Sequence, residues 1–204
     1  MEKLILPKTY LSWSSMNCWM SNKERFRREY FEHGEKLDTK YLRFGKGIAD
    51  LIEKGKHKEL LPDLEVYDSP EFEIRTEIMG VPVLSYIDSY DSKNNVFFEF
   101  KTGKNPWTQA MVQKHDQLTF YATALKYSTG KMPEYCDLVW IETKEGKTKG
   151  TDFWHEGENQ INITGKIKTF HREFDEREIE RMEEIINRAA EQISDAYQSF
   201  IREI

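Results

Sequence analysis

The chain has 204 residues, of which 38% are hydrophobic, 13% aromatic and 32% charged. This length suits one well-filled core better than two independent domains, and the aromatic content is far from that of disordered chains. No segment approaches the roughly 20 apolar residues of a membrane-spanning helix, and the start MEKLILPKTY lacks the apolar run of a secretory signal. We therefore expect a single domain over residues 1–204 that is cytoplasmic and does not contact a membrane.

Cysteine content and charge limit the possible partners. Only Cys18 and Cys136 occur, without a CxxC pair, so the sequence supports neither a zinc site nor a disulfide framework. The formal net charge of −6 disfavours a nucleic-acid partner by itself. The acidity is concentrated at the C-terminus, however: residues 171–204 carry five arginines and ten acids, whereas residues 101–131 carry five lysines and one acid.

The first half of the chain is expected to form helix followed by a β-meander. After the turn SWSS, aromatic residues alternate with basic ones and indicate a helix within the first 32 residues. A second helix is predicted from about Leu42 to Lys54, because apolar residues recur there at helical spacing. Apolar and polar residues then alternate and predict strands at about 72–78, 81–90 and 96–101, joined by short turns.

The second half returns to helix. Asn105 and Pro106 are typical of a helix start, so a long helix is predicted from there to about Tyr127. The segment CDLVWIE predicts a buried strand, and weaker strands are predicted near 152–155 and 161–174. A long acidic helix over residues 175–204 is expected to begin with a capping box that uses Glu178. This order of elements predicts an α/β fold, with a mixed sheet flanked by helices.

The strand VFFEFKTGK carries the residues with the clearest chemical meaning. Side chains alternate along a strand, so Glu99 and Lys101 share one face. Pairing with the preceding strand places Asp88 either opposite Phe97 and diagonal to Glu99 or, after a two-residue slip, directly opposite Glu99. In both registers two carboxylates meet on one face.

Two adjacent carboxylates repel each other unless a positive group lies between them, and oxygen ligands select Mg²⁺ or Mn²⁺. A cation there can polarise a phosphodiester, and Lys101 is placed to orient a water or to neutralise charge in the transition state. Taken alone, these residues are also compatible with a surface Glu–Lys pair beside a hairpin aspartate. Gln117 and Tyr121, four residues apart on one helical face, are likewise compatible with an exposed polar face.

Several motifs in this order resemble those of the PD-(D/E)XK nucleases, in particular the RecB-like and lambda-exonuclease-like branch. The similarity spans about residues 11–126. LSWSSMNCWMSNKERFRREYF is similar to the family's opening helix, FGKGIADLIEKG to its GxxxHxxxE helix, GVPVLSYIDSYD and VFFEFKTGK to its aspartate and ExK strands, and QLTFY to its QxxxY motif. The resemblance implies a restriction-endonuclease-like core and a metal-dependent DNA nuclease.

The resemblance also implies roles for individual residues. Asp88, Glu99 and Glu53 would hold the metal ion, and Lys101 would act with Asp88 and Glu99 in catalysis. Gln117 and Tyr121 would belong to the catalytic set and contact the nucleic acid near the scissile bond. We expect Lys104 and Lys114, in the lysine-rich segment, to bind the nucleic acid as well.

Two departures from the family pattern concern the metal site. Ala49 stands where RecB-like members carry a metal-binding histidine, so either Glu53 alone contributes from this helix or the metal affinity is reduced. The cysteines that bind an iron–sulfur cluster in the CRISPR-associated relatives are absent, and no such cluster is expected.

The sequence therefore predicts a Mg²⁺- or Mn²⁺-dependent deoxyribonuclease, an exonuclease of phage or mobile-element DNA recombination, repair or processing. The expected partner is DNA, at an end or as a single strand, and the end preference is implied by the resemblance alone. A recombination partner protein or a homo-oligomer is compatible with the sequence. One alternative is a catalytically weak DNA-binding or inhibitor protein on the same core, which would not degrade DNA. Another is a protein-interaction scaffold that uses the acidic C-terminal helix and binds no DNA at any salt concentration.

Overall fold

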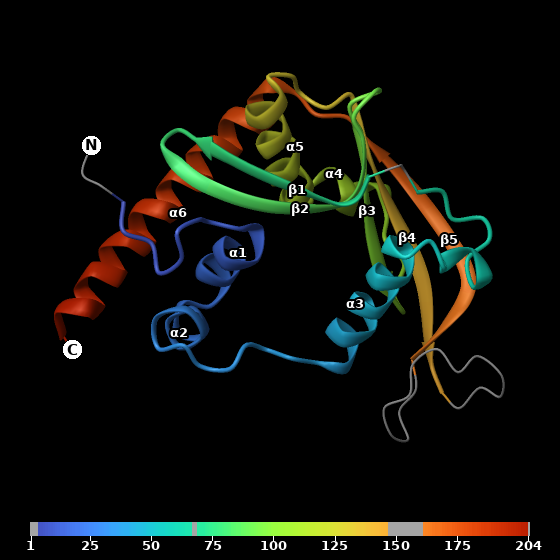
Figure 1. Cartoon of the computed structure of the whole chain (residues 1–204), viewed down its shortest axis with the longest axis horizontal. Coiled ribbons are helices and arrows are strands. Elements are labelled where there is room, and N and C mark those ends of the chain that lie inside the picture. Colours follow the sequence, from blue (N-terminus) through green and yellow to red (C-terminus); the bar gives the residue numbers. More distant parts are fainter. Residues whose placement is uncertain (1–3, 67–68, 147–160, 204) are drawn as a thin grey trace.

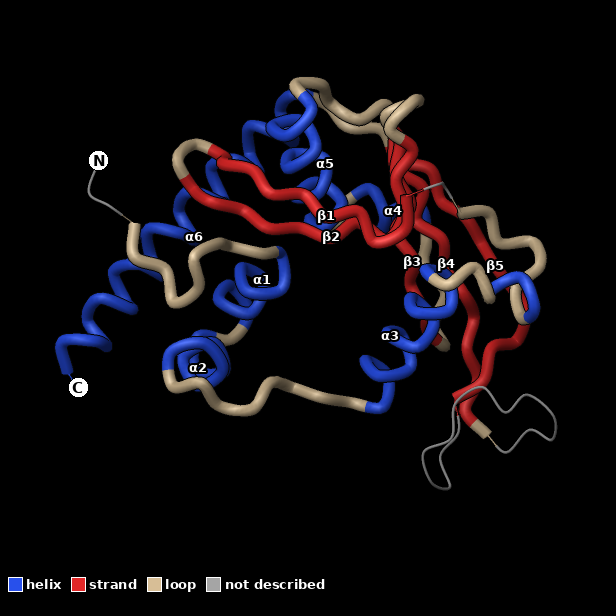
Figure 2. Tube along the Cα trace, in the orientation of Figure 1, coloured by secondary structure: helices blue, strands red, loops and turns tan. Residues whose placement is uncertain are grey.

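The protein consists of helices packed around one five-stranded sheet (Figures 1 and 2). The computed structural model describes residues 4–66, 69–146 and 161–203. The strands are β1 (Ser69–Ile78), β2 (Val81–Asp91), β3 (Val96–Gly103), β4 (Tyr135–Glu145) and β5 (Ile161–Arg172). The helices are α1 (Trp13–Ser21), α2 (Lys23–Phe26), α3 (Lys40–Glu53), α4 (Gln109–Gln113), α5 (Asp116–Thr129) and α6 (Glu176–Glu203), with a π-helical turn η1 (Arg27–Phe31) and a 3₁₀ turn η2 (His57–Glu59). Among the described residues, no helix combines the length and the apolar character that crossing a membrane requires.

The sheet is mixed, with its strands in the order β1-β2-β3-β4-β5. Neighbouring strands are antiparallel except β3 and β4, which are parallel because the chain between them crosses back through α4 and α5. Figure 1 shows α5 and α6 beside the β1–β2 hairpin, while α3 lies in front of β3 and β4. This arrangement confirms the predicted α/β fold with a meander and flanking helices.

The register between β2 and β3 is the second of the two that the sequence allows. Tyr90 pairs with Phe97 and Ser89 with Phe98, so continuing the same register puts Asp88 level with Glu99. The β2–β3 ladder contains only three residue pairs, whereas the β1–β2 ladder contains nine. The long hairpin therefore turns away from the direction of β3–β5, as Figure 1 shows.

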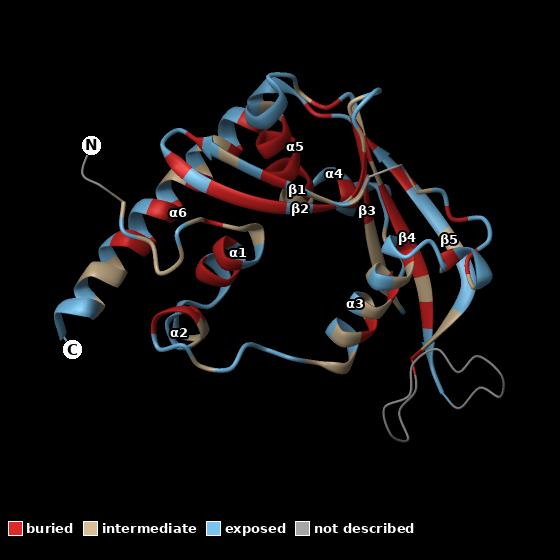
Figure 3. Cartoon of the chain, in the orientation of Figure 1, coloured by how far each residue is buried: buried red, intermediate tan, exposed pale blue. Residues whose placement is uncertain are grey.

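The two faces of β3 and β4 belong to different hydrophobic cores (Figure 3). On one face, Phe97 and Trp140 pack with buried residues of α1, α5 and α6. On the other, Phe100 and Val139 pack with the apolar side of α3. Because side chains alternate along a strand, Glu99 shares the face of Phe97, which α5 covers.

The predicted long helix from Asn105 is wrong in its first part. Thr108 caps the short helix α4, this helix ends at Gln113, and α5 begins at Asp116. At the break, the carbonyls of Val112 and His115 accept from the amides of His115 and Leu118, respectively. The buried Arg172 side chain also donates to both carbonyls, at 3.1 and 2.9 Å, and so stabilises this junction.

The other predicted elements agree with the structure more closely. The opening helix is divided in two, since α1 ends at Ser21 and the Asn22 side chain caps α2 by accepting from the Arg25 amide at 2.9 Å. The last helix has the predicted capping box, in which the Glu178 amide donates to Asp175 at 2.8 Å and the Asp175 amide donates to Glu178 at 3.2 Å. The predicted strand at 161–174 corresponds to β5, and the one at 152–155 lies outside the described residues.

Candidate active site

Asp88 lies where the pairing of β2 with both of its neighbours is interrupted. Its counterpart on β1, Glu71, is missing from the ladder and has a left-handed backbone with φ of 48°. The β2–β3 ladder ends one residue away, at Ser89 and Phe98. The Phe100 amide, which lies beyond the end of this ladder, donates to the Asp88 carboxylate at 2.7 Å. The interrupted pairing thus leaves a backbone donor that holds this carboxylate against β3.

The carboxylate of the half-buried Asp88 interacts with that of the buried Glu99. Burial raises the pKa of Asp88 well above its usual range, and the negative charge of Glu99 raises it further. The Phe100 amide and the Lys101 ammonium oppose these effects without outweighing them. The charged form of Asp88 is therefore disfavoured unless more positive charge is supplied.

Glu99 has an unsatisfied oxygen at this site. The residue is only 3% exposed, and its Oε1 accepts from Lys101 at 2.5 Å. Its Oε2 is buried and has no hydrogen-bond partner among the described residues. A buried carboxylate oxygen without a donor is costly, and a cation shared with Asp88 would satisfy it. The two carboxylates therefore fit a divalent metal ion as oxygen ligands.

A chain of hydrogen bonds fixes Lys101 beside this pair. Its Nζ donates to Glu99 and, at 2.8 Å, to Gln117 Oε1, while Gln117 Nε2 donates to the Tyr121 hydroxyl at 2.8 Å. Burial alone would lower the pKa of Lys101, but the charges of Glu99 and Asp88 outweigh burial and raise it. The ammonium stays charged, and its position depends on Gln117 and Tyr121.

An open cavity of about 430 Å³, here called the active-site cavity, reaches Lys101 and Gln117. Its remaining wall is formed by Trp13 and Asn17 of α1, Trp107 of the loop after β3, and Lys114, His115 and Asp116 at the α4–α5 junction. Of the predicted nucleic-acid contacts, Lys114 and Gln117 line this cavity. Lys104 is exposed in the loop after β3 but does not line it.

Tyr121 is placed behind Gln117 rather than in the cavity. It is 8% exposed, and its pKa is raised by burial and by the charge of Glu99. Its hydroxyl therefore stays protonated and supports Gln117. The geometry favours an indirect role for Tyr121 over the direct nucleic-acid contact expected from the sequence.

The structure does not bring Glu53 to the carboxylate pair. Helix α3 packs Phe44, Ile48 and Ile52 on the face of the sheet opposite Glu99, and Glu53 is exposed at the end of this helix. In the part of the chain that the structure describes, no three His, Cys, Asp or Glu side chains gather in a metal-binding arrangement. Glu53, the expected third ligand, is therefore not at the carboxylate pair. The helical pattern does not specify which face of the sheet α3 covers, and α3 covers the face opposite Glu99.

His115, for which no role was predicted, also lines the active-site cavity. Its ring lies beside that of Trp107, with centroids 4.9 Å apart, and its Nε2 is buried without a partner among the described residues. Burial lowers the pKa of His115 to about 4, with the charges of Lys101 and Arg172 adding to the effect. The imidazole is therefore neutral at neutral pH. His115 lies at the break between α4 and α5, so its place in the cavity could be predicted only if that break were predicted.

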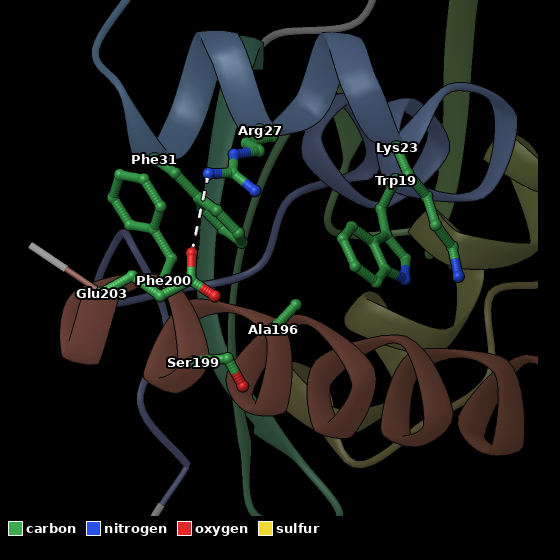
Figure 4. A pocket seen from close by; sticks show the side chains of 8 residues that line it. All are labelled: Trp19, Lys23, Arg27, Phe31, Ala196, Ser199, Phe200 and Glu203. Atoms are coloured by element: carbon green, nitrogen blue, oxygen red, sulfur yellow. Dashed lines mark ion pairs between the residues drawn. The ribbon is translucent and has the colours of Figure 1, made fainter.

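A second cavity, of about 210 Å³, lies between α6 and the segment from α1 to η1 (Figure 4). Trp19, Phe31 and Phe200 supply aromatic surface there, as Figure 4 shows. Glu203 is the only acid among its lining residues, and it forms an ion pair with Arg27 at 3.9 Å. This cavity lacks a carboxylate pair and does not meet the requirements of the metal site.

Comparisons with known proteins identify the family of the chain. The family model of the PD-(D/E)XK nuclease superfamily matches residues 12–202. Curated protein sequences give no significant match. A solved structure of a phage-related exonuclease from Haemophilus somnus 129PT is similar, with a TM-score of 0.54 and 14% identity over 87% of this chain and 79% of that chain.

Two solved structures of LHK-Exo are also similar. The structure of LHK-Exo in complex with dAMP has a TM-score of 0.55 and 11% identity over 97% of this chain and 94% of that chain. The structure of the alkaline exonuclease LHK-Exo from Laribacter hongkongensis has a TM-score of 0.51 and 13% identity over 98% and 94% of the two chains. At these identities the likeness concerns the fold. Since the family model covers nearly the whole chain, the protein belongs to the PD-(D/E)XK nuclease superfamily.

Proposed function

We propose that the chain is a deoxyribonuclease that uses Mg²⁺ or Mn²⁺ held by Asp88 and Glu99. The observation that carries this proposal is the buried Glu99 Oε2, which has no partner among the described residues and adjoins a second carboxylate. Divalent metals are general in the superfamily. Mg²⁺ commonly takes one or two protein carboxylates and completes its coordination with waters and substrate phosphates. Asp88 and Glu99 are therefore enough protein ligands for a Mg²⁺ ion.

The proposed division of labour follows from the contacts of each side chain. A divalent cation at the pair would polarise the phosphodiester and lower the pKa of an attacking water. Lys101 holds a fixed positive charge next to the pair, where it stabilises the charge that develops on the phosphate. Gln117 and Tyr121 keep this ammonium in place through their hydrogen bonds.

The proposed substrate is DNA, attacked from an end or as a single strand. The names of two similar structures, a phage-related exonuclease and an alkaline exonuclease, support an exonuclease. The same names are in keeping with a role in phage or mobile-element DNA recombination or repair. Lys114, which has no acidic partner among the described residues, lines the active-site cavity and supplies a phosphate contact in this proposal.

The test is hydrolysis of end-labelled linear DNA, closed circular DNA, single-stranded DNA and single-stranded RNA with Mg²⁺, Mn²⁺ or EDTA. We expect linear and single-stranded DNA to be degraded with either metal and to remain intact with EDTA or with the Glu99→Gln variant. Full activity in EDTA would contradict the metal site. Rapid cutting of closed circles would contradict the end preference.

A catalytically weak DNA-binding or inhibitor protein is the second candidate. It is favoured by one observation: within the described residues, only two carboxylates meet at the site. In that case the wild-type protein binds DNA but leaves every substrate intact with both metals, an outcome that the same assay detects.

A further inference from the structure

The active-site cavity has aromatic walls that the metal pair does not explain. Trp13, at the start of α1, and Trp107, in the loop after β3, line it and are both only partly buried. Among the residues that the structure describes, neither indole N–H has a hydrogen-bond partner. The indoles of the buried Trp19 and Trp140, by contrast, donate to acceptors within the protein. The two cavity tryptophans thus keep both ring surface and a donor available to a ligand.

The charges around the cavity favour an anionic ligand. Lys114 is exposed and has no acidic partner in the described part of the chain. Asp116, the acid among the lining residues, is bound by Arg181 at 2.5 Å. His115 is neutral at neutral pH, because burial lowers its pKa to about 4. Aromatic surface, an unpaired ammonium and a neutral imidazole together suit a nucleobase with its phosphate.

We infer that the active-site cavity holds one unpaired nucleobase of the substrate strand, stacked on Trp107, next to the phosphodiester at the Asp88–Glu99 pair. This inference rests on the proposed nuclease function and specifies its substrate. Within a duplex, neighbouring bases cover both faces of each base, so a ring can stack on tryptophan only after the base has left the stack. The volume of about 430 Å³ lies within the roughly 300–1,000 Å³ of small-molecule sites. The substrate is therefore a single-stranded or frayed DNA segment.

The first measurement is the dissociation constant of a short single-stranded DNA, determined in the Glu99→Gln background so that no hydrolysis occurs. Loss of one base–aromatic stack is expected to weaken binding by about 5- to 100-fold. We expect this loss for Trp107→Leu and near-wild-type binding for Trp107→Phe, which keeps an aromatic ring. Tyr127→Leu is the matched control, because it removes a partly exposed aromatic residue from the other end of α5, outside the cavity. Equal binding by the Leu and Phe variants of Trp107 would overturn the inference.

The second measurement changes the DNA, so its first readout does not depend on the folding of a Trp107 variant. One nucleotide of the probe is replaced by an abasic residue, and the replacement is moved along the strand. We expect one position at which the abasic probe binds weakly, and at which Trp107→Leu causes little further loss. If no position behaves in this way while wild-type protein still hydrolyses DNA, the stacking inference fails alone. If wild-type protein neither binds nor hydrolyses DNA, the proposed function fails with it.

Discussion

At the scale of single residues, Lys101 separates metal binding from chemistry. Its ammonium contacts Glu99 and Gln117 and is held beside the carboxylate pair. We expect Lys101→Ala to retain the metal but to lose about 10²- to 10³-fold in hydrolysis rate, or roughly 3 to 4 kcal/mol of transition-state stabilisation. Single-turnover kinetics and Mn²⁺ titration measure the two properties separately. Lys126→Ala, which removes a half-buried lysine paired with Glu176 away from the site, is the control. Wild-type rates for Lys101→Ala would contradict the assigned role.

The Tyr121 hydroxyl is hydrogen-bonded to Gln117, which in turn accepts from Lys101. Tyr121→Phe removes the hydroxyl that accepts from the Gln117 amide, worth about 0.5 to 1.5 kcal/mol. The expected result is a loss of about 2- to 10-fold in kcat with little change in KM, because Lys101 becomes less well fixed while the cavity wall is unchanged. A change confined to KM, removed by raising the DNA concentration, would instead indicate a direct contact with the substrate.

We predict that ionisation of Asp88 lowers the free energy of unfolding as the pH rises. Burial and Glu99 raise its pKa in the folded chain, so the folded state binds the proton more tightly than the unfolded state does. Between the usual pKa of the carboxyl and the raised one, the free energy of unfolding therefore falls with increasing pH. Asp88→Asn keeps an oxygen for the Phe100 amide and has no such dependence. We expect its stability advantage over the wild type to grow from about pH 4 upward, as measured by urea unfolding without metal. A difference that is constant with pH would be the contrary result.

At the scale of the elements, the sequence predicted most of the secondary structure, because those elements follow from local periodicity. Alternation along β3 was sufficient to place Glu99 and Lys101 on one face. The register of β2 against β3 remained open, since it depends on how the hairpin loop closes and not on the strand pattern. The break between α4 and α5 was not predicted, because the contacts that stabilise it involve Arg172, far away in the sequence on β5.

Arg172 links β5 to the helices that carry the site. It is 1% exposed, and besides the two carbonyls it donates to Thr119 and Glu178 at 2.8 Å each. Arg172→Leu would remove the hydrogen bonds to Val112, His115, Thr119 and Glu178 and leave a cavity at a buried position, and we expect a loss of about 3 kcal/mol of unfolding free energy. Arg188→Leu, at an exposed position of α6, is the control. Equal urea midpoints for the two variants would show that Arg172 does not stabilise the helix junction.

At the scale of the whole molecule, the face of the sheet on which α3 packs could not be predicted from the sequence. Its amphipathic pattern specified a helix and its buried face correctly. The pattern did not specify which face of the sheet the helix covers, because both faces of β3 and β4 are apolar. The family resemblance implied that Glu53 lies at the carboxylate pair, whereas α3 packs on the opposite face. The meeting of Asp88 and Glu99 could be predicted because these residues lie on neighbouring strands. The position of α3 relative to them could not, because it depends on tertiary packing.

The overall charge makes DNA binding depend on few contacts. The net charge is −6, and we expect three lysines at or near the site, Lys101, Lys104 and Lys114, to contact phosphates, since Arg181 is already paired with Asp116. Three phosphate contacts to a single strand correspond to a slope of about −2 in log Kobs against log salt concentration. Fluorescence anisotropy in the Glu99→Gln background measures this slope, and Lys114→Gln is expected to make it shallower by about 0.7. A slope of about −5 or steeper would require a basic surface outside this site.

The interrupted pairing at Asp88 also provides a spectroscopic reporter of metal occupancy. The Phe100 amide proton is held by the Asp88 side chain at 2.7 Å and not by the backbone of β2. Any change in how that carboxylate is engaged must alter the chemical shift and the solvent exchange of this proton. A single ¹⁵N–¹H resonance would therefore follow the loading of the carboxylate pair in solution, with no DNA present.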